Sequence, residues 1–181
     1  MNKIIVILGM CGSGKSVFCD YLEKKNFKRI YFGEVTFDKL KESGLEVSPE
    51  NERMMREKLR CDGGMGVYAT LNIPKIKEAI KSSDVVVESL YSWDELKILK
   101  ENFSNIVTIA IVVNKQIRYE RLVNRDYRPL TYEEAATRDL TETENIRKCE
   151  PIANADYYIV NNGSIEEFYE RVDEVLNEIY K

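Results

Sequence analysis

The chain has 181 residues, of which 44% are hydrophobic and 32% are charged, and its formal net charge is −4. This length and composition favour one compact globular domain and exclude a disordered chain. The acidic balance argues against binding to nucleic acid or to an anionic membrane surface, because both partners need a basic face.

Histidine is absent and the cysteines are scattered, which restricts metal and disulfide chemistry. No C-x-x-C pair exists, so a zinc site of cysteine and histidine ligands is excluded. Free thiols fit a reducing compartment and predict a cytoplasmic protein. The longest apolar runs, 4–8 and 106–113, are far shorter than the ~20 residues that span a bilayer. We therefore expect neither a membrane anchor nor a signal peptide.

Short β-branched runs alternate with helical patterns along the whole sequence. In chain order the predicted elements are strand 3–9, helix 15–26, strand 28–32, a helical region over 35–81, strand 84–90, helix 92–102, strand 106–113, helix 115–124, helix 132–147, strand 156–161 and helix 164–180. Five strands separated by helices predict an α/β fold with a five-stranded parallel sheet and helices on both faces. Such sheets bind ligands at the carboxyl ends of their strands.

Local signals mark where several of these helices begin. In the helical region, Ser48 and Pro49 are typical of an N-cap and a first helical residue, and Pro74 is expected to open a further helix beyond a glycine-rich break at 62–66. Capping boxes, in which a hydroxyl and a carboxylate satisfy each other's backbone donors, are predicted at three helix starts. Their residue pairs are Ser92 with Glu95, Thr131 with Glu134, and Ser164 with Glu167.

Residues 9–16, GMCGSGKS, form a complete G-x-x-x-x-G-K-S motif between a hydrophobic strand and an amphipathic helix. In this motif the glycines let successive backbone N–H groups turn toward phosphate oxygens, and the positive end of the following helix adds to the attraction. Lys15 is expected to reach the β- and γ-phosphates of ATP, and the Ser16 hydroxyl to bind Mg²⁺. The residues predicted to bind the nucleotide here are Gly9, Cys11, Gly12, Ser13, Gly14, Lys15 and Ser16.

A P-loop also needs a carboxylate near Mg²⁺ on a neighbouring strand. Glu88 closes the apolar run at 85–87 and is predicted to be this catalytic and metal-binding group. Asp84 begins the same strand and is expected at the opposite end of the sheet. At the last strand, Asn162 and Gly163 fit either a plain turn before a helix cap or a loop that lies against the nucleobase.

Candidate acceptor residues follow the other strands. Glu34, just after the second strand, is a candidate general base for a hydroxyl acceptor, or a group that orients the acceptor. Arg60, next to the glycine-rich break, is a candidate for holding an acceptor phosphate. Tyr91, three residues beyond Glu88, is also predicted to contact the acceptor. Arg125 and Arg128 precede Pro129 and are predicted to close over the transferring phosphoryl group as part of a mobile lid.

These residues resemble the adenylate-kinase and dephospho-CoA-kinase branch of P-loop kinases, and most closely a group of adenylate-kinase-related proteins. The resemblance rests on residues 9–16, on the strand that ends at Glu88, on 118–121 and on 155–164. It implies a P-loop NTPase fold of the nucleoside-monophosphate-kinase type, with Mg²⁺ and ATP as donor. Related proteins often have Asp-Gly-x-Arg where this chain has residues 88–91, so an expected acceptor-binding arginine is missing.

The resulting interpretation is one P-loop kinase domain over 1–181. Its core is 1–34 and 82–181, with an acceptor-binding helical segment at 35–81 and a lid at about 125–145. We expect a phosphotransferase that moves the γ-phosphoryl group to a small nucleotide-like acceptor, with a nucleoside monophosphate favoured. Transfer to a ribose hydroxyl, as in dephospho-CoA kinases, and a regulatory nucleotide-binding protein or slow NTPase are the alternatives. The expected partner is a small molecule, and the chain is expected to be a monomer or a homodimer.

Overall fold

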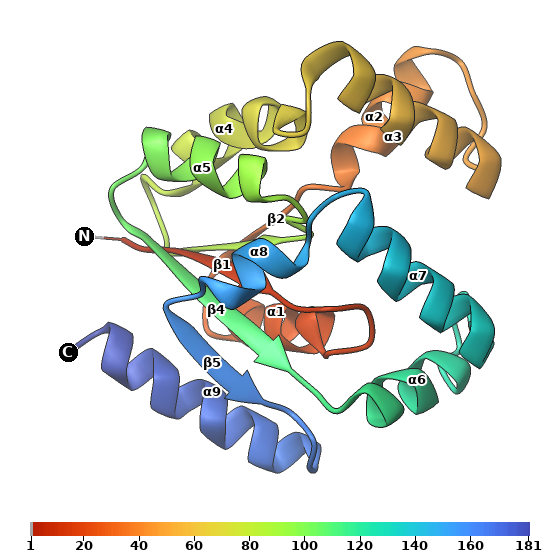
Figure 1. Cartoon of the computed structure of the whole chain (residues 1–181). Helices are drawn as coiled ribbons and strands as arrows, with labels where there is room; N and C mark the ends of the chain where they lie inside the picture. The colour runs from red at the N-terminus through yellow and green to blue at the C-terminus, as the bar shows by residue number, and fades with distance from the viewer. Residues whose placement is uncertain (1) are drawn as a thin grey trace.

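A computed structural model describes residues 2–181 (Figure 1). Its strands form one sheet in the order β2-β3-β1-β4-β5, and every neighbouring pair is parallel. The strands are β1 Ile4–Leu8, β2 Lys28–Tyr31, β3 Val85–Glu88, β4 Ile106–Val112 and β5 Tyr157–Val160. The predicted α/β fold with a five-stranded parallel sheet is confirmed.

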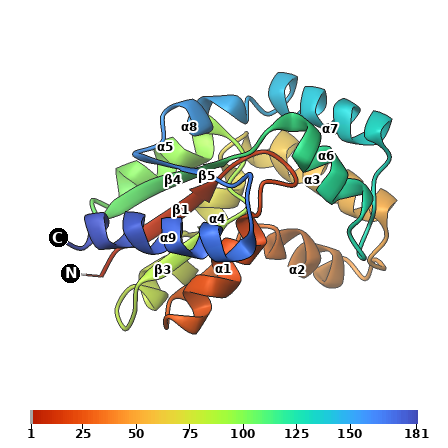
Figure 2. The same cartoon turned by 90° about the horizontal axis from the view of Figure 1, so that it is seen from below.

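Helices cover both faces of this sheet, as predicted. They are α1 Lys15–Lys24, α2 Glu34–Glu42, α3 Pro49–Gly63, α4 Val67–Ala79, α5 Trp93–Asn102, α6 Lys115–Val123, α7 Tyr132–Glu144, α8 Cys149–Ala153 and α9 Ile165–Ile179. Helices α4 and α5 pack on one face, whereas α1 and α9 pack on the other, where Figure 2 views them from below. Within residues 2–181, no helix combines the length and the apolar character needed to cross a membrane.

The central strand β1 shows why a continuous apolar run was the right signal. Ile4, Val6 and Leu8 face the cluster formed with α4 and α5, and Ile5 and Ile7 face the cluster formed with α1 and α9. All five side chains are buried. Successive side chains of a strand point to opposite faces of the sheet. When helices cover both faces, every side chain is buried, so every position favours an apolar residue.

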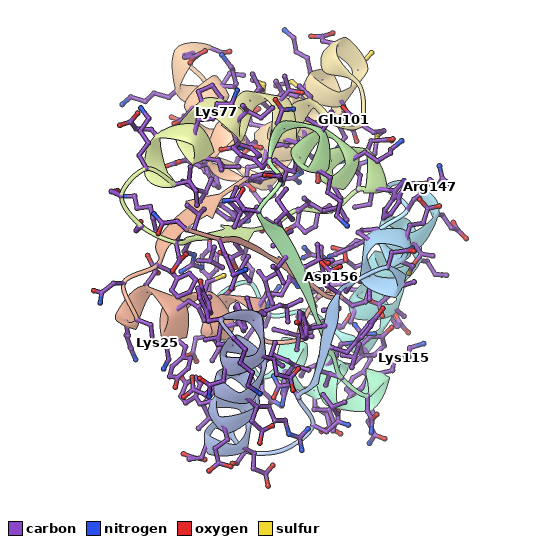
Figure 3. The ribbon with its side chains drawn as sticks, turned by 90° about the vertical axis from the view of Figure 1, so that its left-hand side faces the viewer. Lys25, Lys77, Glu101, Lys115, Arg147 and Asp156 are labelled. Carbon is purple, nitrogen blue, oxygen red and sulfur yellow. The ribbon has the colours of Figure 1, made fainter. Side chains whose placement is uncertain are left out.

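A pair of hydrogen-bonded polar residues joins β5, at one edge of the sheet, to its neighbour β4. At the start of β5, a carboxylate oxygen of Asp156 accepts hydrogen bonds from the backbone N–H and the hydroxyl of Thr108, at 2.8 and 2.6 Å (Figure 3). Thr108 lies in β4 and is fully buried. This pair satisfies a buried hydroxyl and holds the edge strand β5 in register with β4.

Most helix starts agree with the sequence, and one does not. All three capping boxes are present, at the first turns of α5, α7 and α9. Pro74 does not open a helix: it lies inside α4, which begins at Val67 immediately after Gly66. A proline inside a helix costs about 3 kcal/mol. The apolar side chains that α4 buries against the sheet offset this penalty. Helix α7 ends at Glu144, three residues earlier than predicted.

Glu95 is a carboxylate inside the apolar core. It is 1% exposed and accepts hydrogen bonds from the backbone N–H groups of Tyr91 and Ser92, at 2.6 and 3.1 Å. These bonds fix the loop that follows β3. Burial raises the pKa of Glu95 from 4.5 to about 7, since a low dielectric disfavours the charged form.

This burial predicts a pH-dependent stability. A protonated Glu95 favours the folded chain, so its contribution is present below pH 4.5 and is lost as the pH rises to 7. Glu95→Gln should remove this dependence and gain stability relative to wild type by roughly 3 kcal/mol between pH 4.5 and 7, at about 1.4 kcal/mol per tenfold change in proton affinity. Urea unfolding across this range measures the difference. Glu101→Gln, exposed at the end of the same helix, should keep the wild-type curve, and parallel curves for all three proteins would contradict the prediction.

Candidate active site

The loop between β1 and α1 has a backbone that requires glycine. Gly9, Gly12 and Gly14 have φ values of 145°, 79° and 102°, in the left-handed region that other residues rarely adopt. A Cβ at Gly9 would meet the carbonyl oxygen of Ile111 at 2.7 Å, and one at Gly12 would meet that of Arg118 at 2.8 Å. The loop is therefore closely packed on its outer side and leaves its inner side for a ligand.

Two polar side chains on this loop have incomplete partners. The Lys15 ammonium donates to the carbonyl oxygens of Gly9 and Met10, at 2.8 and 2.9 Å, and makes no ion pair within residues 2–181. Burial, with the neighbouring ammonium of Lys148 as the next cause, lowers the pKa of Lys15 to about 7. The Ser13 hydroxyl is buried without any hydrogen-bond partner among the described residues. An anion bound in the loop would satisfy both groups.

Glu88 lies at the carboxyl end of β3 and is 5% exposed. One of its carboxylate oxygens accepts a hydrogen bond of 2.8 Å from the Ser16 hydroxyl. The other accepts from Arg29 of β2, whose Nε lies 2.9 Å away. Asp84 lies at the opposite end of β3, where it accepts from the backbone N–H of Lys3. The phosphate loop and the buried carboxylate thus meet at one edge of the sheet.

The residues at this edge suit a magnesium ion. Ser16 and Glu88 offer a hydroxyl and a carboxylate oxygen, and Mg²⁺ in proteins takes one or two such ligands together with water and substrate phosphates. Among residues 2–181, no group of three or more Asp, Glu, Cys or His side chains converges on one point. A Mg²⁺ ion held by Ser16 and Glu88 would therefore depend on phosphate oxygens for further ligands.

Helix α7 is tied directly to the phosphate loop. The guanidinium group of Arg118, on α6, donates to the carbonyl oxygen of Cys11 at 3.0 Å and to both carboxylate oxygens of Asp139 at 3.0 and 2.6 Å. Asp139 lies on α7 and also accepts from the Tyr119 hydroxyl at 3.1 Å. The Arg118 and Asp139 side chains are 8% and 15% exposed, so the pair is shielded from water. Through Arg118, this link holds α7 next to the phosphate loop.

The final strand contributes one more contact to the loop. Asn161 donates from its side-chain amide to the carbonyl oxygen of Ser13 at 2.9 Å, directly against Gly14. The neighbouring Asn162 accepts from the backbone N–H of Asn114 at 2.9 Å. Gly163 follows in the turn before the α9 cap. The contact of Asn161 with the phosphate loop was not predicted from the sequence, and a nucleobase contact of Asn162 and Gly163 stays a prediction.

A cavity of about 910 Å³ opens between α2, α3, α4 and α7. Its charged and aromatic lining residues include the four arginines Arg56, Arg60, Arg128 and Arg138, the three tyrosines Tyr31, Tyr68 and Tyr91, and the four glutamates Glu52, Glu133, Glu134 and Glu142. Arg60 lies over the Tyr68 ring at 5.4 Å, and its buried Nε has no hydrogen-bond partner among the described residues. Such a lining suits a ligand that has both a planar ring and an anionic group.

The other candidate residues are distributed unevenly around this cavity. Glu34 begins α2, is 56% exposed and pairs with Lys75 at 2.9 Å; it does not line the cavity. Arg128 lines it and pairs with the buried Glu52 at 2.6 Å. Arg125 lies beside Arg128, and its Nε donates to the carbonyl oxygen of Arg128 at 2.6 Å. Both arginines are therefore bound to protein groups in this arrangement.

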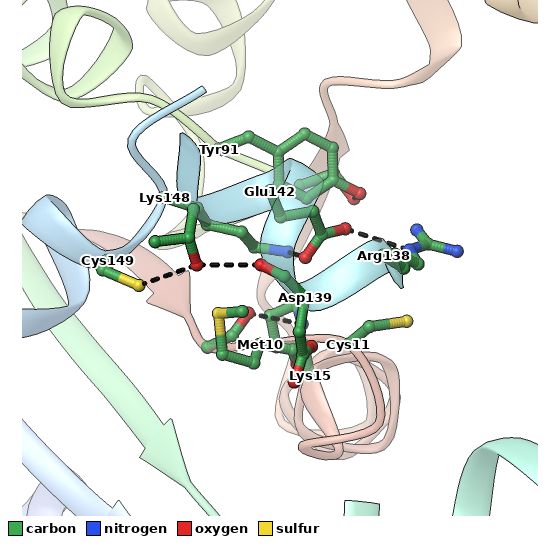
Figure 4. Close-up of polar contacts among 12 residues, drawn as sticks. Met10, Cys11, Lys15, Tyr91, Arg138, Asp139, Glu142, Lys148 and Cys149 are labelled. Atoms are coloured by element: carbon green, nitrogen blue, oxygen red, sulfur yellow. Dashed lines mark hydrogen bonds and ion pairs between the residues drawn. The ribbon is translucent and has the colours of Figure 1, made fainter. Parts of the chain in front are cut away.

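A further group of charges lies between the cavity and the phosphate loop, and the sequence did not single it out. Glu142 of α7 binds the Lys148 ammonium at 2.6 Å and the Nε of Arg138 at 3.0 Å. Lys148 is 2% exposed and lies 4.4 Å from the centre of the Tyr91 ring. Figure 4 shows Lys148 and Arg138 reaching Glu142 from opposite sides, above the loop that holds Lys15.

Comparison with known proteins gives this architecture a family. Residues 5–152 match a family described as an AAA domain. A UPF0200 protein of Thermococcus kodakarensis is 34% identical over 181 residues, covering 97% of each chain, and a UPF0200 protein of Sulfurisphaera tokodaii is 36% identical over 186 residues, covering 98% of this chain and 97% of its own. The chain belongs to the AAA domain family and to UPF0200. The name UPF0200 states neither a reaction nor a phosphoryl acceptor.

Solved structures show that this UPF0200 chain has the fold of P-loop kinases. The protein TT1252 of Thermus thermophilus superimposes with a TM-score of 0.71 at 17% identity, over 98% of this chain and 97% of its own. Shikimate kinase of Bacteroides thetaiotaomicron gives 0.60 at 16% identity, over 97% and 98%, and dephospho-CoA kinase of Campylobacter jejuni gives 0.57 at 18%, over 98% and 97%. At these identities the likeness concerns the fold alone.

We expect the Arg118–Asp139 ion pair to stabilise α7 locally in this UPF0200 protein. Asp139→Asn leaves the buried guanidinium of Arg118 without a charged partner, which typically costs 3–5 kcal/mol. We expect hydrogen exchange to accelerate in α7 and in the phosphate loop, where Arg118 also binds Cys11, and not in α4 or α5. Glu144→Gln, at an exposed position on the same helix, is the control. Equal exchange in both variants would show that the pair does not hold α7.

Proposed function

We propose that this protein is an ATP-dependent phosphotransferase of the adenylate-kinase branch, which transfers the γ-phosphoryl group to a nucleoside monophosphate. One observation carries the proposal: the arginine- and tyrosine-lined cavity adjoins the phosphate loop. Glu142 lines the cavity and is also one of the charges that act on Lys15, and Figure 4 draws two further lining residues, Tyr91 and Arg138, above the loop that holds Lys15. An acceptor bound in this cavity would meet the terminal phosphate of a donor bound in the loop.

On the donor side, the backbone N–H groups of the loop and the positive end of α1 bind the phosphates of ATP. The Lys15 ammonium leaves its carbonyl partners for the β- and γ-phosphate oxygens. Ser16 and Glu88 would hold Mg²⁺, which would offset negative charge on the phosphate oxygens. Arg29 holds the Glu88 carboxylate oriented toward Ser16.

On the acceptor side, the segment 35–81 and the lid at about 125–145 enclose the acceptor. Arg60, whose Nε has no partner, binds the acceptor phosphate, and Tyr68 and Tyr91 contact its ring. An oxygen of that phosphate forms a bond to the γ-phosphorus while the bond from this phosphorus to the bridging oxygen of ADP breaks. The lid arginine Arg128 exchanges Glu52 for phosphate oxygens when the lid closes.

The position of Glu34 favours a phosphate acceptor over a ribose hydroxyl. A phosphate oxygen is already a nucleophile, whereas a hydroxyl needs a general base within hydrogen-bond reach. Glu34 is the candidate for that base, but it faces Lys75 outside the cavity. Of the acidic side chains that line the cavity, Glu52 and Glu142 are paired with cations, and Glu134 accepts from the backbone N–H of Thr131 in the capping box of α7. Glu133 lines it too, in the first turn of the same helix.

The donor assignment predicts a ligand-dependent melting temperature. Mg-ATP should raise it, because a ligand that binds only the folded state stabilises that state by RT ln(1 + [L]/Kd). Lys15→Ala should abolish most of this shift and nearly all turnover while leaving the melt of the free protein close to wild type. Differential scanning fluorimetry at millimolar Mg-ATP measures both. A wild-type melting temperature that stays unchanged at millimolar Mg-ATP would contradict the donor assignment.

The acceptor assignment predicts a separate effect at Arg60. Arg60→Gln should raise KM for the acceptor at least about tenfold, because a charge-assisted contact to phosphate is lost, and should leave the affinity for Mg-ATP within about twofold. Steady-state rates with a panel of nucleoside monophosphates measure this effect. The control is Arg53→Gln, which changes an exposed arginine on the same helix. If no monophosphate stimulates ATP consumption many-fold, the protein is a slow NTPase and the acceptor assignment is wrong.

A further inference from the structure

Lys148 is a buried cation with no role in the scheme above. Its side chain is 3% exposed, and its charged partner is Glu142, a carboxylate that it shares with Arg138. Lys15 lies close enough for the charge of Lys148 to lower its pKa. Three cations therefore surround one carboxylate, because the nearby Asp139 is already bound to Arg118.

This charge balance is unfavourable in the free protein. Removing an ammonium group from water costs several kcal/mol, and a buried ion pair recovers this energy only when the charges compensate each other. Here the carboxylate of Glu142 is divided between two cations, and Lys15 forms no ion pair with any carboxylate of residues 2–181. If packing alone had shaped this site, an apolar residue at position 148 would be expected to serve better. A surplus of buried positive charge instead suits a polyanion that arrives from outside.

The backbone before Lys148 is also held in an unusual conformation. Arg147 has a φ of 53°, in the left-handed region, where a non-glycine residue costs of order 1 kcal/mol or more. This residue turns the chain back after α7, so that the backbone N–H of Lys148 donates to the carbonyl oxygen of Glu142 at 3.1 Å. The turn directs the Lys148 ammonium over Tyr91 and toward the phosphate loop (Figure 4).

We propose that Lys148 is a catalytic cation that contacts the transferring phosphoryl group, with Glu142 holding its ammonium in position until ATP binds. The inference rests on the proposed phosphotransferase function and adds a residue to it. The Lys148 ammonium donates hydrogen bonds to the γ-phosphoryl oxygens and offsets their negative charge while the acceptor oxygen bonds to phosphorus and ADP leaves. Arg138, the second partner of Glu142, binds the same group from the other side.

The test compares affinities for ATP and for ADP, which differ only in the γ-phosphoryl group. Lys148→Met, Lys148→Arg and Glu142→Gln are measured by calorimetry with Mg-ADP and with the magnesium complex of the non-hydrolysable β,γ-imido analogue of ATP. Lys25→Met is the matched control, because Lys25 also pairs with a carboxylate, that of Asp173, and lies over a tyrosine ring, that of Tyr21, but far from the cavity.

Lys148→Met should weaken the ATP analogue about tenfold or more, leave ADP within about twofold, and lower kcat by on the order of 10²-fold. Lys148→Arg should recover part of each loss. Glu142→Gln should leave binding of the analogue as tight as in wild type or tighter, because the competing carboxylate is gone. A merely structural ion pair would give the opposite pattern, with equal losses for both nucleotides in Lys148→Met and in Glu142→Gln.

An unchanged ratio of the two affinities in Lys148→Met would overturn the inference. If that variant does not fold, Lys148→Arg decides: the inference requires its kcat to fall while its melting temperature stays near wild type. The two proposals fail separately. Wild-type protein that binds the analogue but transfers to no acceptor contradicts the phosphotransferase, whereas active wild-type protein with an unaffected Lys148→Met variant contradicts only the role of Lys148.

Discussion

The site depends on the contacts made by the buried carboxylate of Glu88, because these contacts join three parts of the fold. It ends β3, it binds the first turn of α1 through Ser16, and it binds β2 through Arg29. A carboxylate that is 5% exposed would be strongly destabilising without these partners. The same contacts that make it tolerable also orient it toward the phosphate loop. The same contacts of Glu88 therefore serve both the stability of the fold and the chemistry proposed for the site.

Charge at the site is organised in the opposite way on the two sides of the phosphate loop. Below the loop, at β2 and β3, the single cation Arg29 contacts three carboxylates, those of Glu88, Asp20 and Glu23. Above it, the three cations Lys15, Arg138 and Lys148 lie near the one carboxylate of Glu142. The first group has an excess of negative charge and the second an excess of positive charge. A bound polyphosphate would offset the excess above the loop.

The sequence predicted the sheet and the phosphate loop well, because both depend on local signals. Apolar runs such as 4–8, a complete glycine motif and capping boxes each carry their own physical cause within a few residues. The side chains around the ligand were harder to foresee. Arg29 and Lys148 are ordinary charged residues in the sequence, and only the fold brings them to Glu88 and Glu142 across 59 and six positions. Pro74 was misread because burial of α4 outweighs a local preference.

The pairing of Glu52 with Arg128 has a kinetic consequence. It connects α3, in the segment that forms one wall of the cavity, to the chain just before α7, and both partners line the cavity entrance. Glu52 is 3% exposed, so it loses favourable contacts when Arg128 moves away, unless Arg56 takes over the whole charge. Any movement that takes Arg128 away from Glu52 therefore crosses an energy barrier set by this ion pair.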